Sequence, residues 1–109
     1  MDNKDLIAEW ETATKGSREL DCRLYLTVIR RVSLELWPSF MPVAERESLH
    51  YSTSLDAKLP GENIIEMYRD EGGWQAWHQD PRTKEITLGV GRTEILARRI
   101  AGLRGMDAK

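Results

Sequence analysis

Apolar residues follow helical spacing twice at the start of the chain. In residues 3–14, Leu6 and Trp10 repeat one turn apart, with polar side chains between them. Residues 17–31 carry a second apolar stripe, and Ser17 is a suitable N-cap for it. The pattern therefore predicts two short amphipathic helices.

The pattern changes to alternation over residues 62–90. The segments "ENIIEMYRD", "WQAWHQD" and "EITLGV" are separated only by the turn sequences "EGG" and "PRTK". Connections this short join neighbouring antiparallel strands, so the segments predict a three-stranded meander. In the third strand we expect alternate apolar side chains to face the core, namely Ile86, Leu88 and Val90.

The stretch "GRTEILARRIAGLRG", residues 91–105, predicts a final helix with Thr93 as its N-cap. Ala97 and Ala101 would allow close approach to the sheet. The larger apolar residues form a stripe that we expect to pack on the third strand: Leu96, Ile100 and Leu103. The opposite side of the helix would then expose the arginines.

Residues 32–50 are dense in apolar side chains, but Pro38 and Pro42 argue against a continuous helix or a central strand. A long segment with this apolar content is expected to be ordered, either against the core or as a surface for a partner. The side chains expected to pack it are Trp37, Phe40 and Met41.

Together these elements predict one α+β domain over residues 1–109. It would contain a three- to four-stranded antiparallel sheet with N-terminal helices and a C-terminal helix in an α/β/α sandwich. Charged residues make up 31% of the chain and no apolar run is long enough to cross a bilayer, so we expect no membrane association. The acidic N-terminus does not resemble a signal peptide, which favours the cytoplasm.

The sequence offers no constellation that predicts an enzyme. His50 and His78 do not have metal-ligand spacing, and Cys22 is the single cysteine. His78 and Asp80 at a strand end are most simply a turn-stabilising pair, and Ser52, Thr53 and Ser54 are expected to cap local structure. We expect no catalytic residue, no metal and no cofactor.

The net charge of −2 is unevenly distributed, because residues 91–109 carry +3 and the first ninety carry −5. Four arginines give the final helix a basic face that would suit water, an acidic protein or nucleic acid: Arg92, Arg98, Arg99 and Arg104. Trp74 and Trp77 lie on opposite faces of their strand, so one of them, taken here as Trp77, is a candidate binding aromatic.

Three segments, in the right order, carry a family resemblance. "RELDCRLYL" at residues 18–26, "YSTSLDAKL" at 51–59 and the final helix at 91–105 together resemble the phage ABA sandwich domain family of small phage and prophage proteins. The resemblance implies helices arranged about an antiparallel sheet and a phage setting. It implies no catalytic residue.

These observations favour a phage or prophage accessory protein, monomeric or homodimeric, that binds a host or phage protein without catalysis. The most concrete version is an inhibitor of a bacterial defence system, comparable to an anti-CRISPR protein. Its acidic side chains would face a basic partner surface: Asp70, Glu71, Glu45 and Glu47. The alternative is a nucleic-acid-binding module with the α-β-β-β-α order of double-stranded-RNA-binding domains, using the basic final helix.

Overall fold

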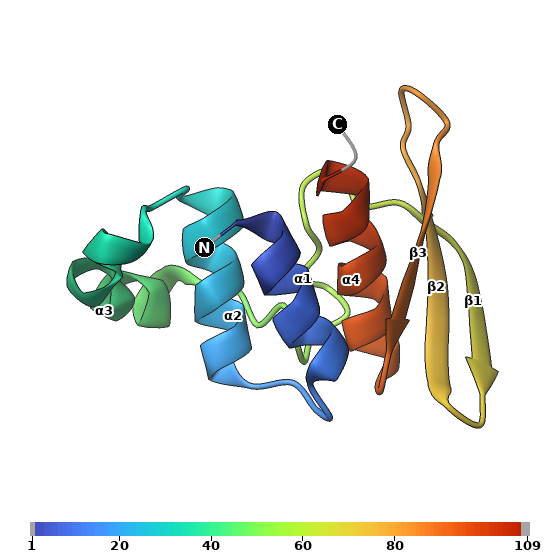
Figure 1. Cartoon of the computed structure of the whole chain (residues 1–109), viewed down its shortest axis with the longest axis horizontal. Coiled ribbons are helices and arrows are strands. Elements are labelled where there is room, and N and C mark those ends of the chain that lie inside the picture. Colours follow the sequence, from blue (N-terminus) through green and yellow to red (C-terminus); the bar gives the residue numbers. More distant parts are fainter. Residues whose placement is uncertain (1, 108–109) are drawn as a thin grey trace.

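A computed structural model of the protein describes residues 2–107. The elements in chain order are α1 (Asn3–Thr12), α2 (Arg18–Leu24), the π-helix η1 (Tyr25–Ile29), the 3-10 turn η2 (Leu34–Leu36), α3 (Trp37–Glu47), β1 (Ile64–Asp70), β2 (Gly73–Gln79), β3 (Ile86–Gly91) and α4 (Glu94–Asp107). The three strands form one antiparallel sheet in the order β1-β2-β3 (Figure 1). The α+β class and the meander are confirmed.

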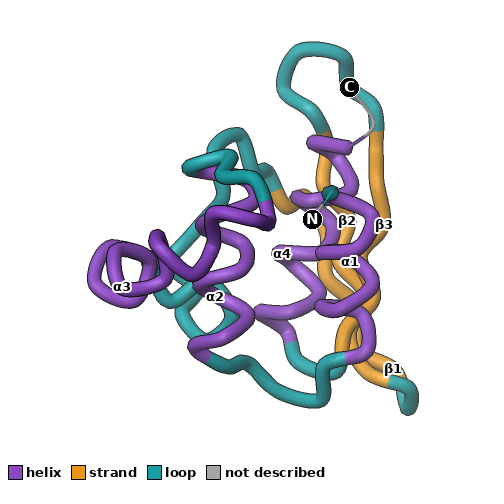
Figure 2. Tube along the Cα trace, turned by 60° about the vertical axis from the view of Figure 1, so that its left-hand side comes forward, coloured by secondary structure: helices purple, strands orange, loops and turns teal. Residues whose placement is uncertain are grey.

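The layers follow one another in a single direction. Helix α4 lies against the sheet, α1 and α2 lie beyond α4, and α3 is the outermost helix (Figures 1 and 2). The expected sandwich placed helices about both faces of the sheet, whereas the described helices all lie on one side. The other face, here called the outer face, is left without a covering layer.

The side of β3 that faces α4 differs from the prediction. Ile86 and Val90 are exposed on the outer face, and the inner face of β3 instead presents Thr87 and Gly89. A Cβ added to Gly89 would lie 2.2 Å from the backbone nitrogen of Ala101, so strand and helix are nearly in backbone contact. Small residues on both elements permit this approach, and large side chains on the inner face would prevent it. The alternating pattern therefore predicted a strand correctly, but it assigned the wrong side of that strand to the core.

The main core is helical. It joins the apolar stripes of α1, α2, η1 and α4 with residues of the 48–62 connection, and its fully buried members include Leu6, Trp10, Leu24, Leu26, Leu96, Ile100 and Leu103. Helix α4 therefore turns its large apolar stripe toward the other helices and its alanines toward the sheet. The expected packing of that stripe on β3 is wrong, whereas the close approach at Ala97 and Ala101 is confirmed.

Residues 37–47 form a helix in spite of two prolines. Pro38 lies in the first turn of α3, where backbone N–H groups have no intrahelical acceptor, so proline costs no hydrogen bond there. Pro42 lies one turn later and removes only one bond of the helical ladder. Burial of Trp37 and Ala44 against the core offsets that loss. The expectation that the prolines would prevent a continuous helix is wrong.

Candidate interaction surface

The outer face of the sheet carries a row of uncovered apolar side chains. Trp77 of β2 stands in register between Glu66 of β1 and Leu88 of β3. The next row places Tyr68, Gln75 and Val90 side by side. We define the outer sheet face by its apolar members, which are Ile65, Tyr68, Trp77, Ile86, Leu88 and Val90.

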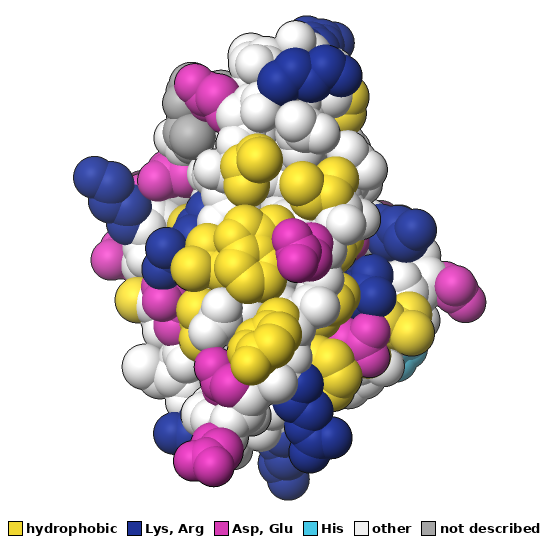
Figure 3. Space-filling model, turned by 90° about the vertical axis from the view of Figure 1, so that its right-hand side faces the viewer, with side chains coloured by type: hydrophobic (Ala, Val, Ile, Leu, Met, Phe, Trp, Pro, Cys, Tyr) yellow, Lys and Arg dark blue, Asp and Glu magenta, His cyan; other side chains and the backbone are white. Residues whose placement is uncertain are grey.

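These side chains are unusually accessible for their type. Tyr68 is 56% exposed, Ile86 is 55% exposed and Val90 is 43% exposed. Figure 3 views this side of the molecule and shows the apolar side chains gathered over its middle, with an acidic group among them and further charged groups around the margin. A contiguous apolar patch with a charged rim is typical of an interaction surface.

The geometry of β2 separates its two tryptophans as expected. Trp74 lies on the inner face beside Ala76, and the guanidinium carbon of Arg69 lies 5.5 Å from the centre of its ring. Trp77 lies on the outer face, where it is half-buried by its neighbours. The ring of Trp77 is held by its neighbours and still has accessible surface, and tryptophans of this kind are frequent in binding hot spots.

The four arginines of the final helix do not form one basic surface. Arg99, expected on the exposed side, is completely buried, because α4 lies between the sheet and the other helices and is covered on nearly every side. Arg98 is paired at 2.9 Å with Glu94, which lies one helical turn before it. Arg104 is paired with Glu11 of α1 at 2.8 Å. Arg92 is exposed, and no ion pair joins it to another described residue.

Arg99 instead fastens the segment before the sheet to α4. Its Nη1 donates to Glu62 Oε2 at 2.6 Å, and its other nitrogens donate to the carbonyl oxygens of Tyr51, Ser54 and Leu55. Burial raises the pKa of the Glu62 carboxyl in spite of the lowering effect of Arg99, and burial likewise lowers the pKa of Arg99. The guanidinium is held by four acceptors inside the protein, which explains how a charge is tolerated there.

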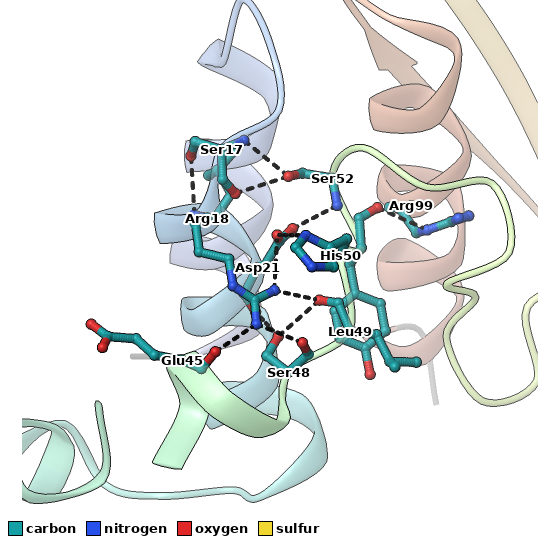
Figure 4. Close-up of polar contacts among 11 residues, drawn as sticks. Ser17, Arg18, Asp21, Glu45, Ser48, Leu49, His50, Ser52 and Arg99 are labelled. Carbon is teal, nitrogen blue, oxygen red and sulfur yellow. Dashed lines mark hydrogen bonds and ion pairs between the residues drawn. The ribbon is translucent and has the colours of Figure 1, made fainter. Parts of the chain in front are cut away.

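A second buried charge, Asp21 of α2, holds the start of the same segment (Figure 4). Its Oδ1 accepts from the backbone N–H of Ser52 at 2.7 Å, and its Oδ2 accepts from Arg18 at 3.3 Å. Arg18 also donates to three carbonyl oxygens at the end of α3 and in the residues that follow it. The network therefore ties α2 to residues 45–52.

Serine, histidine and aspartate occur together in this network, but not in a catalytic arrangement. His50 Nδ1 lies 3.8 Å from Asp21 Oδ2, and the imidazole is largely exposed. The hydroxyls of Ser48 and Ser52 donate to backbone carbonyl oxygens, and among residues 2–107 neither is hydrogen-bonded to His50. A nucleophile needs a base within hydrogen-bond reach, so these serines have a structural role. The expected local capping is wrong for Ser52, because its hydroxyl donates to the carbonyl oxygen of Ser17, far away in the sequence, and so joins two distant segments.

The other candidate residues are dispersed. Trp37 is buried and donates from Nε1 to the Val32 carbonyl oxygen at 3.1 Å, and Phe40 and Met41 pack half-buried against the core. Glu45 and Glu47 are exposed on α3, far from the sheet (Figure 1). Asp70 and Glu71 are exposed at the β1-β2 turn, where Asp70 accepts from the backbone of Gly72.

Sequence reasoning missed two residues that organise the structure, Glu62 and Asp21. Glu62 lies between Gly61 and Asn63, where nothing in the sequence marks it as buried, whereas Asp21 lies between Leu20 and Cys22, and its spacing to Leu24 was the signal that could have found it. His78 and Asp80 are buried as well; Asp80 accepts from two backbone N–H groups of the β2-β3 turn, which fits the turn-stabilising interpretation.

Over residues 2–107, no three His, Cys, Asp or Glu side chains are placed to hold a metal ion together. No helix in that range has the length and apolar content needed to cross a membrane. Comparison of the sequence with protein-family models, with curated proteins and with solved structures finds no match. The resemblance to phage ABA sandwich domains therefore stays a prediction.

Proposed function

We propose that the protein works without catalysis, by binding another protein through its outer sheet face. The observation that carries the proposal is the accessibility of apolar side chains on that face, where Tyr68 and Ile86 are more than half exposed beside Trp77. Soluble monomers rarely leave a contiguous apolar patch uncovered unless it is used.

The chemistry of the face indicates the kind of partner. Its centre is aromatic and aliphatic, Gln75 and Gln79 supply neutral hydrogen-bonding groups, and Glu66 is the charge nearest Trp77. None of the β1 and β3 residues in register with Gln75, Trp77 and Gln79 is an arginine or a lysine, which argues against a nucleic-acid backbone as the occupant. An apolar protein surface with one cationic group opposite Glu66 fits this composition.

The resemblance in residues 18–26, 51–59 and 91–105 supports a more specific proposal. In that version the protein is a phage or prophage accessory protein whose partner belongs to the host or the phage, and a bacterial defence protein is the partner of most interest. The runner-up, nucleic-acid binding by the final helix, loses its main support because Arg99 is buried and two further arginines are ion-paired.

A photo-crosslinking residue at Gln75, in register with Tyr68 and Val90, would test the proposal in a host lysate. We expect one specific adduct, lost in Ile86→Lys and kept in Leu34→Lys. The two positions are matched in exposure, since both side chains are 55% exposed, and Leu34 belongs to η2, which directly precedes α3, the helix farthest from the sheet in Figure 1. An adduct that survives Ile86→Lys, or one that contains only a second copy of the chain, would overturn the proposal.

A further inference from the structure

A cavity of about 660 Å³ lies where η1 and the residues after it meet the two ends of the described chain. It is far from the outer sheet face, because its walls come from α1, η1, residues 31–33, Pro60 and the end of α4. Val28, Val32 and Met106 supply apolar wall, and the volume falls in the usual range of small-molecule sites.

The backbone beside this cavity is irregular in two ways. The second helix continues as a π-helix over Tyr25–Ile29, a form that occurs frequently at functional sites. Arg31 then has φ 54°, and the N–H of Val32 donates to the Leu26 carbonyl oxygen at 2.8 Å to close the helix end. Glycine is the usual residue at such a left-handed position, so an arginine there is held against its conformational preference.

One cation of the cavity has no ion pair within the described part of the chain. The Arg31 side chain is exposed at the cavity and has no ion pair among residues 2–107, whereas the adjacent Arg30 has Glu47 at 3.9 Å. Thr27 Oγ1 also makes no hydrogen bond in that range, but it is inaccessible to solvent and therefore out of reach of a ligand in the cavity. Within residues 2–107 the site thus combines apolar walls with one cation that has no ion pair.

We propose that this cavity binds a small amphipathic carboxylate. Arg31 would receive the carboxylate, because a guanidinium matches the two oxygens of that group. The apolar part of the ligand would lie against Val28, Val32 and Met106. One guanidinium without an ion pair among residues 2–107 fits a ligand with one negative charge.

Octanoate is the probe for the test, followed by amide chemical shifts of the full chain, with octanol as its neutral counterpart. We expect saturable shifts confined to residues 26–33 and their neighbours, and binding of octanol weaker by about tenfold or more. Arg31→Gly should weaken octanoate binding to the level of octanol. Arg30→Ala, which removes the adjacent cation outside the cavity, should bind as the parent does.

Arg31→Gly also separates binding from folding, because glycine relieves the left-handed backbone and should raise the melting temperature. A stable variant that no longer binds octanoate would support the site. Octanoate bound equally by the Arg31→Gly variant, octanol bound as tightly as octanoate, shifts centred on the outer sheet face, or no saturable shift would each overturn the proposal.

Discussion

Arg99 and Glu62 form an ion pair inside the protein, with 2.6 Å between Nη1 and Oε2 and both side chains essentially inaccessible to water. The pair joins α4 to the residue that precedes β1 by two positions. Arg99 adds three hydrogen bonds to the carbonyl oxygens of residues 51–55, so one side chain fixes most of a connection that has no helix or strand of its own.

Arg99→Ala should therefore destabilise the fold by about 3 to 5 kcal/mol, because it leaves the Glu62 carboxylate and three carbonyl oxygens buried without their donor. Arg98→Ala is the matched control, since it removes the adjacent arginine from a partly exposed pair and should cost about 1 kcal/mol or less. Urea denaturation of both variants gives the comparison. Equal losses of unfolding free energy in the two variants would show that Arg99 does not hold residues 51–62 against α4.

The same pair predicts a pH dependence. Burial raises the pKa of Glu62 in the folded protein above its ordinary value of 4.5, so the folded state binds this proton more tightly than the unfolded state. The contribution of this proton to the free energy of unfolding is fully present below pH 4.5 and is lost as the pH rises through the pKa that Glu62 has in the folded protein. Glu62→Gln removes this titration. The unfolding free energy of the parent, relative to that variant, should be higher at about pH 4 than at about pH 7.

Urea midpoints at the two pH values measure this difference directly. Glu35→Gln, at an exposed carboxylate, provides the control for the loss of one charge. A parent that gains stability relative to Glu62→Gln as the pH rises would mean that the attraction of Arg99 outweighs burial at this site.

Local sequence patterns predicted the helices and strands themselves better than they predicted what packs against each one. Helical spacing of Leu6 and Trp10 and alternation in residues 62–90 depend on neighbours along the chain, and both gave the right element. The orientation of an alternating strand depends on what packs against it, and β3 presents Gly89 to the alanines of α4. The burial of Arg99 depends on Glu62, a residue 37 positions away. The spacing of residues within α4 alone does not show that Arg99 has a buried partner in another segment.

The outer sheet face was missed for the same reason. The expectation that Ile86, Leu88 and Val90 form core assigned three exposed apolar residues of the sheet to the interior, and left Trp77 as the one apolar surface candidate on the strands. Two features of the sequence could have shown that the apolar residues of β3 face outward. Gly89 interrupts the strand, and Ala97 and Ala101 lie one turn apart on the helix. Small residues on two adjacent elements indicate where backbones approach.

Ile100→Ala and Ile86→Ala should separate the two sides of the molecule. Ile100 is fully buried in the helical core, so truncation should leave a cavity and cost about 2 to 5 kcal/mol. Ile86 is 55% exposed on the outer sheet face. Its truncation should change the free energy of unfolding by no more than about 0.5 kcal/mol in either direction, the ordinary range for surface positions. Thermal melts of both variants test the assignment. A large loss in Ile86→Ala would place that side chain in a core.

Gly89→Ala tests the contact between the sheet and α4. The added methyl carbon would lie 2.2 Å from Ala101 N and 2.3 Å from Ala97 O, and both are backbone atoms that cannot move without displacing the helix. The cost should be at least about 3 kcal/mol, the upper end for overpacking, with a drop in melting temperature on the order of 12 °C. Gly72→Ala is the control, since its nearest neighbour is the Asp70 carboxylate at 3.4 Å and its cost should stay within about 1 kcal/mol. If both variants melted alike, α4 would not rest on the glycine of β3, and the side of the sheet that is free for a partner would have to be reassigned.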